Sequence, residues 1–144
     1  MRRLRGIAAS EGIAFGTAWV VDRRAIRTPK HHIEPDQVEA EITRFRDALQ
    51  QTERQLKRIE EKLVDVGGQD HLLILQAHQL FLRDERLIDA TLQRITRDQI
   101  NAEWAVSRTV DEIKAVFDKL EDDYFRERAS DVGYVADALL HTLT

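Results

Sequence analysis

The sequence predicts a mainly α-helical domain: an antiparallel helical bundle, built from a long helix hairpin plus shorter helices, with a short N-terminal β segment. From residue 36 onward, apolar residues recur at spacings of three and four, which is the period of an α-helix. Asp84 and Asn101 each stand before a new apolar run, as helix N-caps do. Before residue 23, by contrast, Gly6, Gly12 and Gly16 separate short apolar runs, which is typical of turns and strands.

The chain divides into three parts by these patterns. Its 144 residues, 42% of them hydrophobic and 33% charged, have the length and composition of one globular unit. Residues 1–22 are predicted to form two short strands. Residues 23–35 resemble a linker because they contain Pro29, Pro35 and the adjacent pair His31 and His32. Residues 36–144 are predicted to form the helical bundle.

The first predicted helix is long, about 30 residues. Pro35 suits a first helical turn, and Gly67 and Gly68 end the pattern. Between them, the apolar positions alternate spacings of four and three, which predicts a coiled-coil-like seam against a partner helix. One alternative is that this seam mediates self-association of a structural coiled-coil module. The seam positions are Val38, Ile42, Phe45, Leu49, Leu56, Ile59, Leu63 and Val66, with Thr52 filling the one gap.

Four further helices are predicted after Gly68. Residues 69–83 form a helix too apolar for a one-sided surface helix, so it is either central or part of a docking surface. Asp84 caps the next helix and Asn101 the one after it. The residues Asp122 and Asp123 mark a break before the last helix, which carries Tyr124, Phe125, Val132, Val135, Leu139 and Leu140.

Charge and residue types exclude several classes of protein. The formal charge is −4, so a strongly basic nucleic-acid binder is not expected. Residues 1–30 carry a net +5 and residues 31–144 a net −9, and such an acidic body either favours a basic partner or serves solubility alone. There is no cysteine, which excludes disulfides and thiolate chemistry and is compatible with a reducing cytoplasm. No apolar run approaches the roughly 20 residues of a membrane-spanning helix.

Catalytic and metal-binding signatures are absent from the sequence. It has no phosphate-binding loop of the Walker type and no His-Glu-x-x-His zinc motif. His31 and His32 are adjacent and point in different directions, and His71 and His78 are two helical turns apart, too distant to chelate one ion. His78 lies in the most apolar helix, where a hydrogen-bonded structural histidine or a partner contact is expected. These residues favour a binding module over an enzyme.

Three segments, in order, resemble enzyme I of the bacterial phosphotransferase system. The opening Gly6–Gly16 (GIAASEGIAFG) resembles the start of that family. Residues 76–84 (QAHQLFLRD) resemble the end of one of its helices, and residues 122–132 (DDYFRERASDV) resemble its "DDEYL.ERA.D" segment. The resemblance covers essentially the whole chain.

This resemblance implies a cytoplasmic phosphotransferase that moves phosphate from phosphoenolpyruvate to a histidine and then to the carrier protein HPr. In that family, the phosphorylated histidine lies in a Gly-Gly-x-x-Ser/Thr-His stretch of an α/β domain, and a C-terminal barrel that dimerises binds phosphoenolpyruvate and magnesium. Neither is found in this sequence. The chain is therefore expected to be an inactive N-terminal fragment, without a cofactor, that docks HPr; residues 1–22 would begin the α/β domain. No nucleic-acid partner and no membrane insertion are expected.

The resemblance also implies which residues contact HPr. The apolar positions of the groove would be Leu80, Phe81, Leu87, Phe117 and Phe125. The acidic positions would be Asp70, Asp84 and Glu85, with Arg128 at the edge and His78 as a further contact.

Two other functions remain as alternatives. The carrier could be the HPr paralogue of the nitrogen-regulatory branch. Residues 82–89 (LRDERLID) also loosely resemble the first helix of chorismate mutase, a helical enzyme that needs several arginines and a Glu or Gln converging in a buried pocket.

Overall fold

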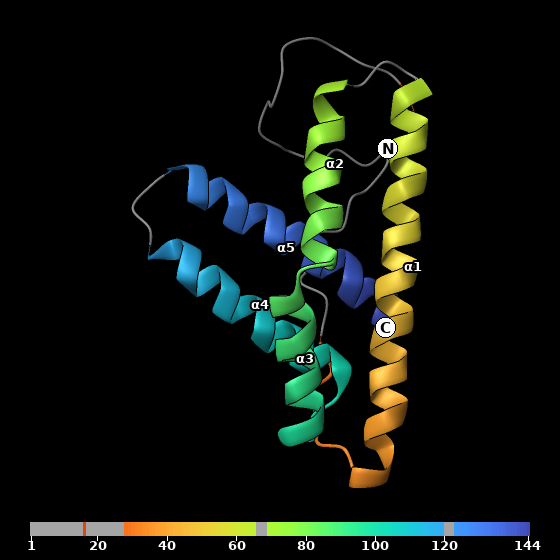
Figure 1. The fold of residues 1–144 in the computed structure, drawn as a ribbon, viewed down its shortest axis with the longest axis vertical. Coiled ribbons are helices and arrows are strands. Elements are labelled where there is room, and N and C mark those ends of the chain that lie inside the picture. Colours follow the sequence, from red (N-terminus) through yellow and green to blue (C-terminus); the bar gives the residue numbers. More distant parts are fainter. Residues whose placement is uncertain (1–15, 17–27, 66–68, 120–122) are drawn as a thin grey trace, which may run out of the picture.

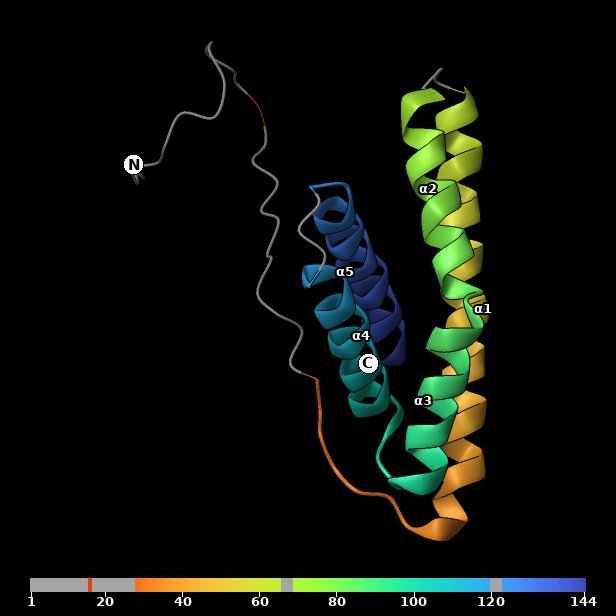
Figure 2. The same ribbon diagram turned by 60° about the vertical axis from the view of Figure 1, so that its left-hand side comes forward.

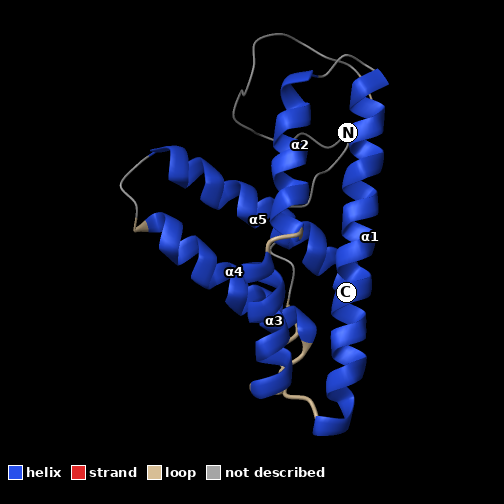
Figure 3. Ribbon diagram, viewed as in Figure 1, coloured by secondary structure: helices blue, strands red, loops and turns tan. Residues whose placement is uncertain are grey.

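A computed structural model of the chain describes residue 16 and residues 28–65, 69–119 and 123–144 (Figure 1). Within these residues the structure is helical, and the one β-type pairing is an isolated antiparallel bridge between His32 and Ile100 (Figure 3). The prediction of a mainly α-helical bundle is confirmed. Of the two strands predicted in residues 1–22, only Gly16 belongs to the described part, so that prediction lies outside it. In chain order the elements are the 3-10 turn η1 (Pro35–Gln37), α1 (Val38–Asp65), α2 (Gln69–Leu82), α3 (Glu85–Arg97), α4 (Ala102–Asp118) and α5 (Asp123–Leu143).

The helices form two layers. Helix α1 runs the length of the molecule, and α2 and α3 lie end to end beside it, so that the three make one layer (Figure 2). The second layer is the α4–α5 hairpin, which packs against α1, α2 and α3. The predicted long helix hairpin is therefore α1 with α2, continued by α3. The core between the layers is formed mainly by Phe45, Leu87, Ile95, Ile100, Val106, Val135 and Leu139.

The seam of α1 is buried by helices of the same chain. Phe45, Thr52 and Leu56 are buried, as the periodicity predicts, and Ala48 completes the covered face. The Thr52 hydroxyl donates to the Ala48 carbonyl at 2.8 Å and lies 3.0 Å from the Thr142 hydroxyl, so α5 supplies a polar partner inside the seam. Ile59 departs from the prediction because it is 47% exposed. Near that end of α1, α2 is the one described helix alongside (Figure 2).

The start of α3 is set as the sequence predicts. Asp84 has an extended backbone, and its side chain accepts a hydrogen bond from the Arg86 backbone N–H at 2.8 Å. Such a cap satisfies one of the donors left open at a helix start. Thr91 and Ile95 follow Leu87 at four-residue spacing, and this buried stripe turns one face of α3 into the core.

Asn101 occupies the N-cap position of α4 but does not cap the helix with its side chain. Its amide instead holds the incoming chain: Oδ1 accepts from the His31 N–H at 3.1 Å, and Nδ2 donates to the Pro29 carbonyl at 2.9 Å. Ile33 is buried beside this contact, and its N–H donates to the carbonyl of Gln99, a residue with a positive φ of 50°. The Asn101 side chain therefore does not cap α4, because the backbone of Pro29 and His31 occupies its amide. We call this anchoring of residues 29–33 by Asn101 the clasp.

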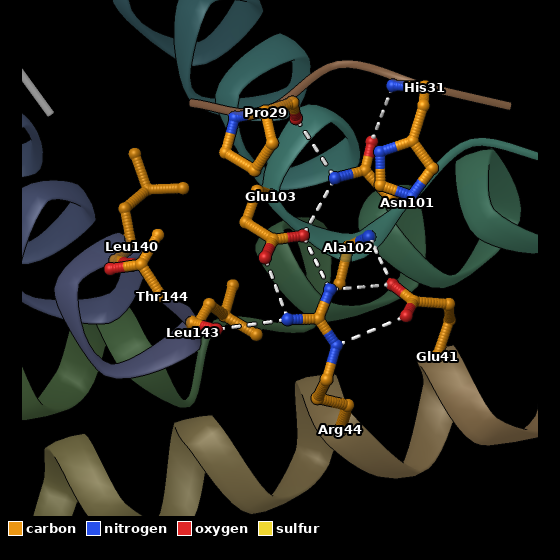
Figure 4. Close-up of polar contacts among 10 residues, drawn as sticks. All are labelled: Pro29, His31, Glu41, Arg44, Asn101, Ala102, Glu103, Leu140, Leu143 and Thr144. Atoms are coloured by element: carbon orange, nitrogen blue, oxygen red, sulfur yellow. Dashed lines mark hydrogen bonds and ion pairs between the residues drawn. The ribbon is translucent and has the colours of Figure 1, made fainter. Parts of the chain in front are cut away.

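A buried polar cluster joins this clasp to α1 and α5 (Figure 4). The Arg44 guanidinium donates to Glu103 Oε1 at 2.7 Å, to Glu41 Oε2 at 2.9 Å and to the Leu143 carbonyl at 2.9 Å. Glu103 also accepts from Asn101 Nδ2 at 2.7 Å, and Glu41 accepts from the Ala102 N–H at 2.7 Å. We call Glu41, Arg44, Asn101 and Glu103 the base cluster.

Charge pairing sets the protonation of the base cluster. Burial acts to raise the pKa of Glu103, but the hydrogen bonds and charge of Arg44 and the hydrogen bond from Asn101 outweigh it, and the pKa ends below its usual range. The same contact with Glu103, and that with Glu41, outweigh desolvation and raise the pKa of Arg44 further above its usual range. Both groups are therefore charged at neutral pH.

Candidate functional site

A groove runs between the α2–α3 side of one layer and the α4–α5 hairpin. It consists of two adjoining cavities of about 220 and 320 Å³. Phe81, Asp84 and Phe117 line both cavities: the half-buried Phe81 and Phe117 form the shared apolar floor, and the exposed Asp84 lies at its edge. The first cavity extends toward α5, where it meets Asp131, and the second follows α3 and α4 as far as Glu112. We call this pair of cavities the interlayer groove.

The walls of the interlayer groove expose large apolar side chains. Leu80 is 70% exposed and Val116 is 61% exposed, while Phe81 and Phe117 are half-buried between them. Leu73 is also exposed and lies seven residues before Leu80, so the two share a face of α2 beyond the groove. Exposed side chains of this size gathered on one face mark a surface that another molecule covers. The sequence predicts helix α2 to be either central or part of a docking surface; its last residue, Leu82, is buried, whereas Leu73, Ile74 and Leu80 are exposed, so it is not central, and the docking surface stays a prediction.

The rim of the groove is mainly acidic. Asp84, Glu112 and Asp131 line it together with one cation, Arg86. Arg94 reaches Glu112 at 2.5 Å and, as a hydrogen-bond donor, lowers the pKa of that carboxyl. Glu85, next to the rim, is exposed. Carboxylates around an apolar floor suit a partner that is basic around an apolar patch.

His78 lies in the wall of the first cavity. Its Nε2 is 3.6 Å from Asp131 Oδ1, too far for a hydrogen bond, and this buried atom has no hydrogen-bond partner among the described residues. The hydrogen-bonded structural role expected for this histidine is thus not found in the described part of the chain. The contact it does make joins α2 to α5 across the groove.

The structure brings together five of the ten predicted contact residues: His78, Leu80, Phe81, Asp84 and Phe117 all line the interlayer groove. Glu85 lies beside it. Leu87 departs from the expectation, because it is 1% exposed and belongs to the stripe by which α3 packs into the core. The side chains of Asp70, Phe125 and Arg128 lie outside the described residues.

Apart from Phe117, sequence reasoning missed the residues that α4 and α5 contribute to the groove. These are chiefly Glu112, Ile113, Val116, Asp131 and Val132. Val116 carries a usable signal, since it is next to Phe117 in a run of apolar residues too wide for one buried face. Asp131 carries none, because an acidic residue on a helix is usually solvated.

Other kinds of site find no support in the described residues. No group of three or more His, Asp or Glu side chains among them is placed to hold a metal ion. None of the described helices is both long and apolar enough to cross a membrane. Of the described residues that line the groove, Arg86 is the one arginine, whereas the chorismate mutase alternative needs several.

Comparison with known proteins decides the family. The family described as "PEP-utilising enzyme, N-terminal" matches residues 5–128, which is most of the chain. The chain belongs to this family. The PEP-utilising N-terminal family therefore spans both the predicted β segment and most of the helical bundle, and the resemblance to enzyme I is confirmed.

Curated relatives of this PEP-utilising N-terminal chain carry one name, phosphoenolpyruvate-protein phosphotransferase. The protein of that name from Bacillus subtilis is 33% identical over 92% of this chain, and that from Listeria monocytogenes is 34% identical over 99%. The relative from Haemophilus influenzae is 31% identical over 97%. The chain spans about a quarter of the length of these relatives, 23% to 24%.

A solved structure supports the same assignment at the level of the fold. The solution structure of an Enzyme I protein superposes with a TM-score of 0.78 at 29% identity, covering 83% of this chain and 48% of that one. Sequence and fold together match the N-terminal domain of enzyme I.

Proposed function

We propose that this chain is the carrier-docking part of an enzyme I, a phosphoenolpyruvate–protein phosphotransferase, and that the interlayer groove binds the phosphocarrier HPr. The observation that carries the proposal is the groove itself: Leu80 and Val116 are exposed beside half-buried Phe81 and Phe117, with Asp84, Glu112 and Asp131 around them. Apolar anchors of this kind give a complex most of its affinity. The acidic rim speeds encounter with a basic partner and orients it.

The chemistry that docking serves is phosphoryl transfer between two proteins. The whole enzyme takes phosphate from phosphoenolpyruvate onto a histidine and passes it to HPr. The contribution of this chain is to bind HPr during that transfer. Binding the carrier in one orientation makes the transfer effectively unimolecular, which can be worth about 7–11 kcal/mol of the barrier in well-oriented systems. Because this sequence lacks the Gly-Gly-x-x-Ser/Thr-His stretch that holds the phosphorylated histidine in the family, we expect the chain alone to be inactive.

The remainder of the proposal concerns the whole enzyme. Residues 1–22 begin its α/β phosphohistidine domain, residues 23–35 connect, and residues 36–144 form the HPr-binding domain. A C-terminal barrel supplies the phosphoenolpyruvate and magnesium sites and dimerises the enzyme in the cytoplasm. The clasp on Pro29 and His31 supports a fixed connection, since it ties the linker to the bundle through Asn101.

A calorimetric titration of the chain with HPr from the same organism, at low and high salt, tests the docking role. We expect binding in the micromolar range that weakens as salt rises, because the rim charges are screened. The HPr paralogue of the nitrogen branch is titrated in parallel to identify the carrier. No binding of either carrier at either salt would contradict the proposal.

The self-association alternative is tested by the same material. Other helices of the same chain cover the seam of α1, where Thr52 contacts Thr142 of α5, so we expect a monomer at micromolar concentration. Sedimentation velocity of residues 1–68 alone is the direct check. A stable helical oligomer of that piece would favour the coiled-coil module instead.

A further inference from the structure

The interlayer groove contains one cation, Arg86, whose side chain has no direct partner among the described residues. Arg86 lines the larger cavity together with Asp84 and Glu112. Its backbone N–H is bound by Asp84, but its guanidinium forms no ion pair or hydrogen bond with any described residue. Its neighbours differ in this respect, since Arg83 pairs with Glu53 and Arg94 pairs with Glu112.

The two carboxylates that line the same cavity as Arg86 each have another contact. Asp84 Oδ1 accepts the N–H that starts α3, at 2.8 Å, and Glu112 Oε1 binds the Arg94 guanidinium at 2.5 Å. The guanidinium is therefore left at the rim with its five donors available to a ligand.

The position is also an unfavourable one for a cation. Arg86 is the second residue of α3, where the helix dipole is positive and an acidic residue is the usual choice. A positive charge in this first turn typically costs a few tenths to about 1 kcal/mol. Asp84 and Glu85 are acidic neighbours in the chain, but neither forms a side-chain pair with Arg86, so its guanidinium is open to a group of a second molecule.

We propose that Arg86 binds a carboxylate of the docked partner, so that the partner surface is basic and apolar with one acidic side chain set into it. This inference rests on the proposed docking function and adds the charge pattern that selects the partner. Asp84, Glu85 and Asp131 attract the basic groups of that surface, while Arg86 disfavours a surface that is basic throughout. A charge-assisted pair with a planar guanidinium is directional, so it also fixes register in the groove.

The occupant that this pattern fits is a small basic protein and not a second copy of this chain. The chain carries a net charge of −4, and its rim places several carboxylates together, so two such rims repel each other. A partner with mixed charge meets both signs at once. Such a mixed charge pattern gives specificity both by attracting the matching partner and by repelling partners with a different charge pattern.

Charge reversal at Arg86 is the test. Titrating the Arg86→Glu chain with HPr at low salt should weaken binding by about tenfold, and Arg86→Gln should weaken it by about threefold, as for other charges at the edge of an interface. The matched control is Arg97→Glu, which makes the same charge change in the last turn of α3, outside the groove residues. We expect at most a twofold effect there, from long-range charge alone.

The outcomes separate this inference from the docking proposal. If the wild-type chain binds HPr and Arg86→Glu binds it equally or more tightly, the docking role stands and the inference on Arg86 is wrong. If the wild-type chain does not bind, the docking role itself fails and the inference fails with it. A concentration-dependent dimer of the wild-type chain that Arg86→Glu abolishes would also overturn it, because the occupant would then be a second copy.

Discussion

The base cluster and the rim of the interlayer groove each contain carboxylates and one arginine, and they differ in whether the arginine side chain finds partners inside the described chain. In the base cluster, the donors of Arg44 meet Glu41, Glu103 and a carbonyl of α5, and Asn101 is held on both sides of its amide (Figure 4). In the groove, Leu80 is mostly exposed and the Arg86 guanidinium meets no described partner.

This difference separates a region that holds the fold together from one that is open to a ligand. Removing one member of a buried, fully hydrogen-bonded cluster leaves the other members without partners, which lowers the free energy of unfolding. Replacing an exposed leucine strands nothing within the chain. Mutations in the first region should therefore change stability, and mutations in the second should change binding.

The largest effect on stability is expected for Arg44→Ala. It leaves the nearly buried carboxylate of Glu103 without its main partner, which should cost about 3 kcal/mol; this is the lower end of the range for buried pairs, because Arg44 is itself 37% exposed. Urea unfolding followed by circular dichroism measures it. The control is Arg83→Ala, which breaks the more exposed pair with Glu53 and should cost under about 1 kcal/mol. Equal losses in the two variants would show that burial does not set the cost of breaking these pairs, and the base cluster would then not be a special source of stability.

Leu80→Asp should have the opposite signature. We expect HPr binding to weaken by about 30-fold or more, since a charge then occupies an apolar anchor. The free energy of unfolding should change by less than about 0.5 kcal/mol because the side chain is already exposed. Val64→Asp is the matched control: Val64 is exposed on α1 and does not line the groove. An unchanged affinity of Leu80→Asp would place the docking surface elsewhere.

Asp84→Ala sharpens the comparison because Asp84 belongs to both functions. It caps α3 and it lines both cavities. Loss of the cap should destabilise the chain by about 1 kcal/mol. The adjacent Glu85→Ala, which removes the same charge but no cap, should change stability by less than about 0.5 kcal/mol. Thermal unfolding of both variants measures the contribution of the cap. If both variants weaken HPr binding to a similar extent, the negative charge at the rim acts in binding independently of the cap.

The smallest effect expected is confined to acid. The folded-state pKa of Glu103 lies below its value in the unfolded chain, which is about 4.3 for a free glutamate. Its contribution is therefore complete above that unfolded value and is lost as pH falls through the folded pKa. Comparing urea midpoints at several pH values for wild type and Glu103→Gln isolates this part. The wild-type stability should fall more steeply in acid, and parallel curves would contradict the assignment.

The helices could be predicted because their signals are local. Asp84 stands before a regular apolar run and caps α3, and the four-and-three spacing of α1 identifies Phe45 and Leu56 as buried. The apolar excess of α2 indicated a central or docking helix, and the resemblance to enzyme I predicted Leu80 and Phe81 as its contact residues. The opposite wall, with Glu112 and Asp131, gave no such signal, because which face of α4 or α5 meets α2 depends on how the layers pack.

The sequence by itself determined where the helices begin and end, since period, caps and glycines act within a few residues of one another. Tertiary structure alone decided which members of an apolar set are covered. Leu80 and Leu87 lie on successive helices, but packing of the two layers buries Leu87 and leaves Leu80 exposed. It also turned Asn101 from the expected cap into a clasp, because a backbone segment 70 residues earlier in the chain reaches its amide. Contacts between residues so distant in the chain depend on the angle at which helices cross, and no local pattern encodes that angle.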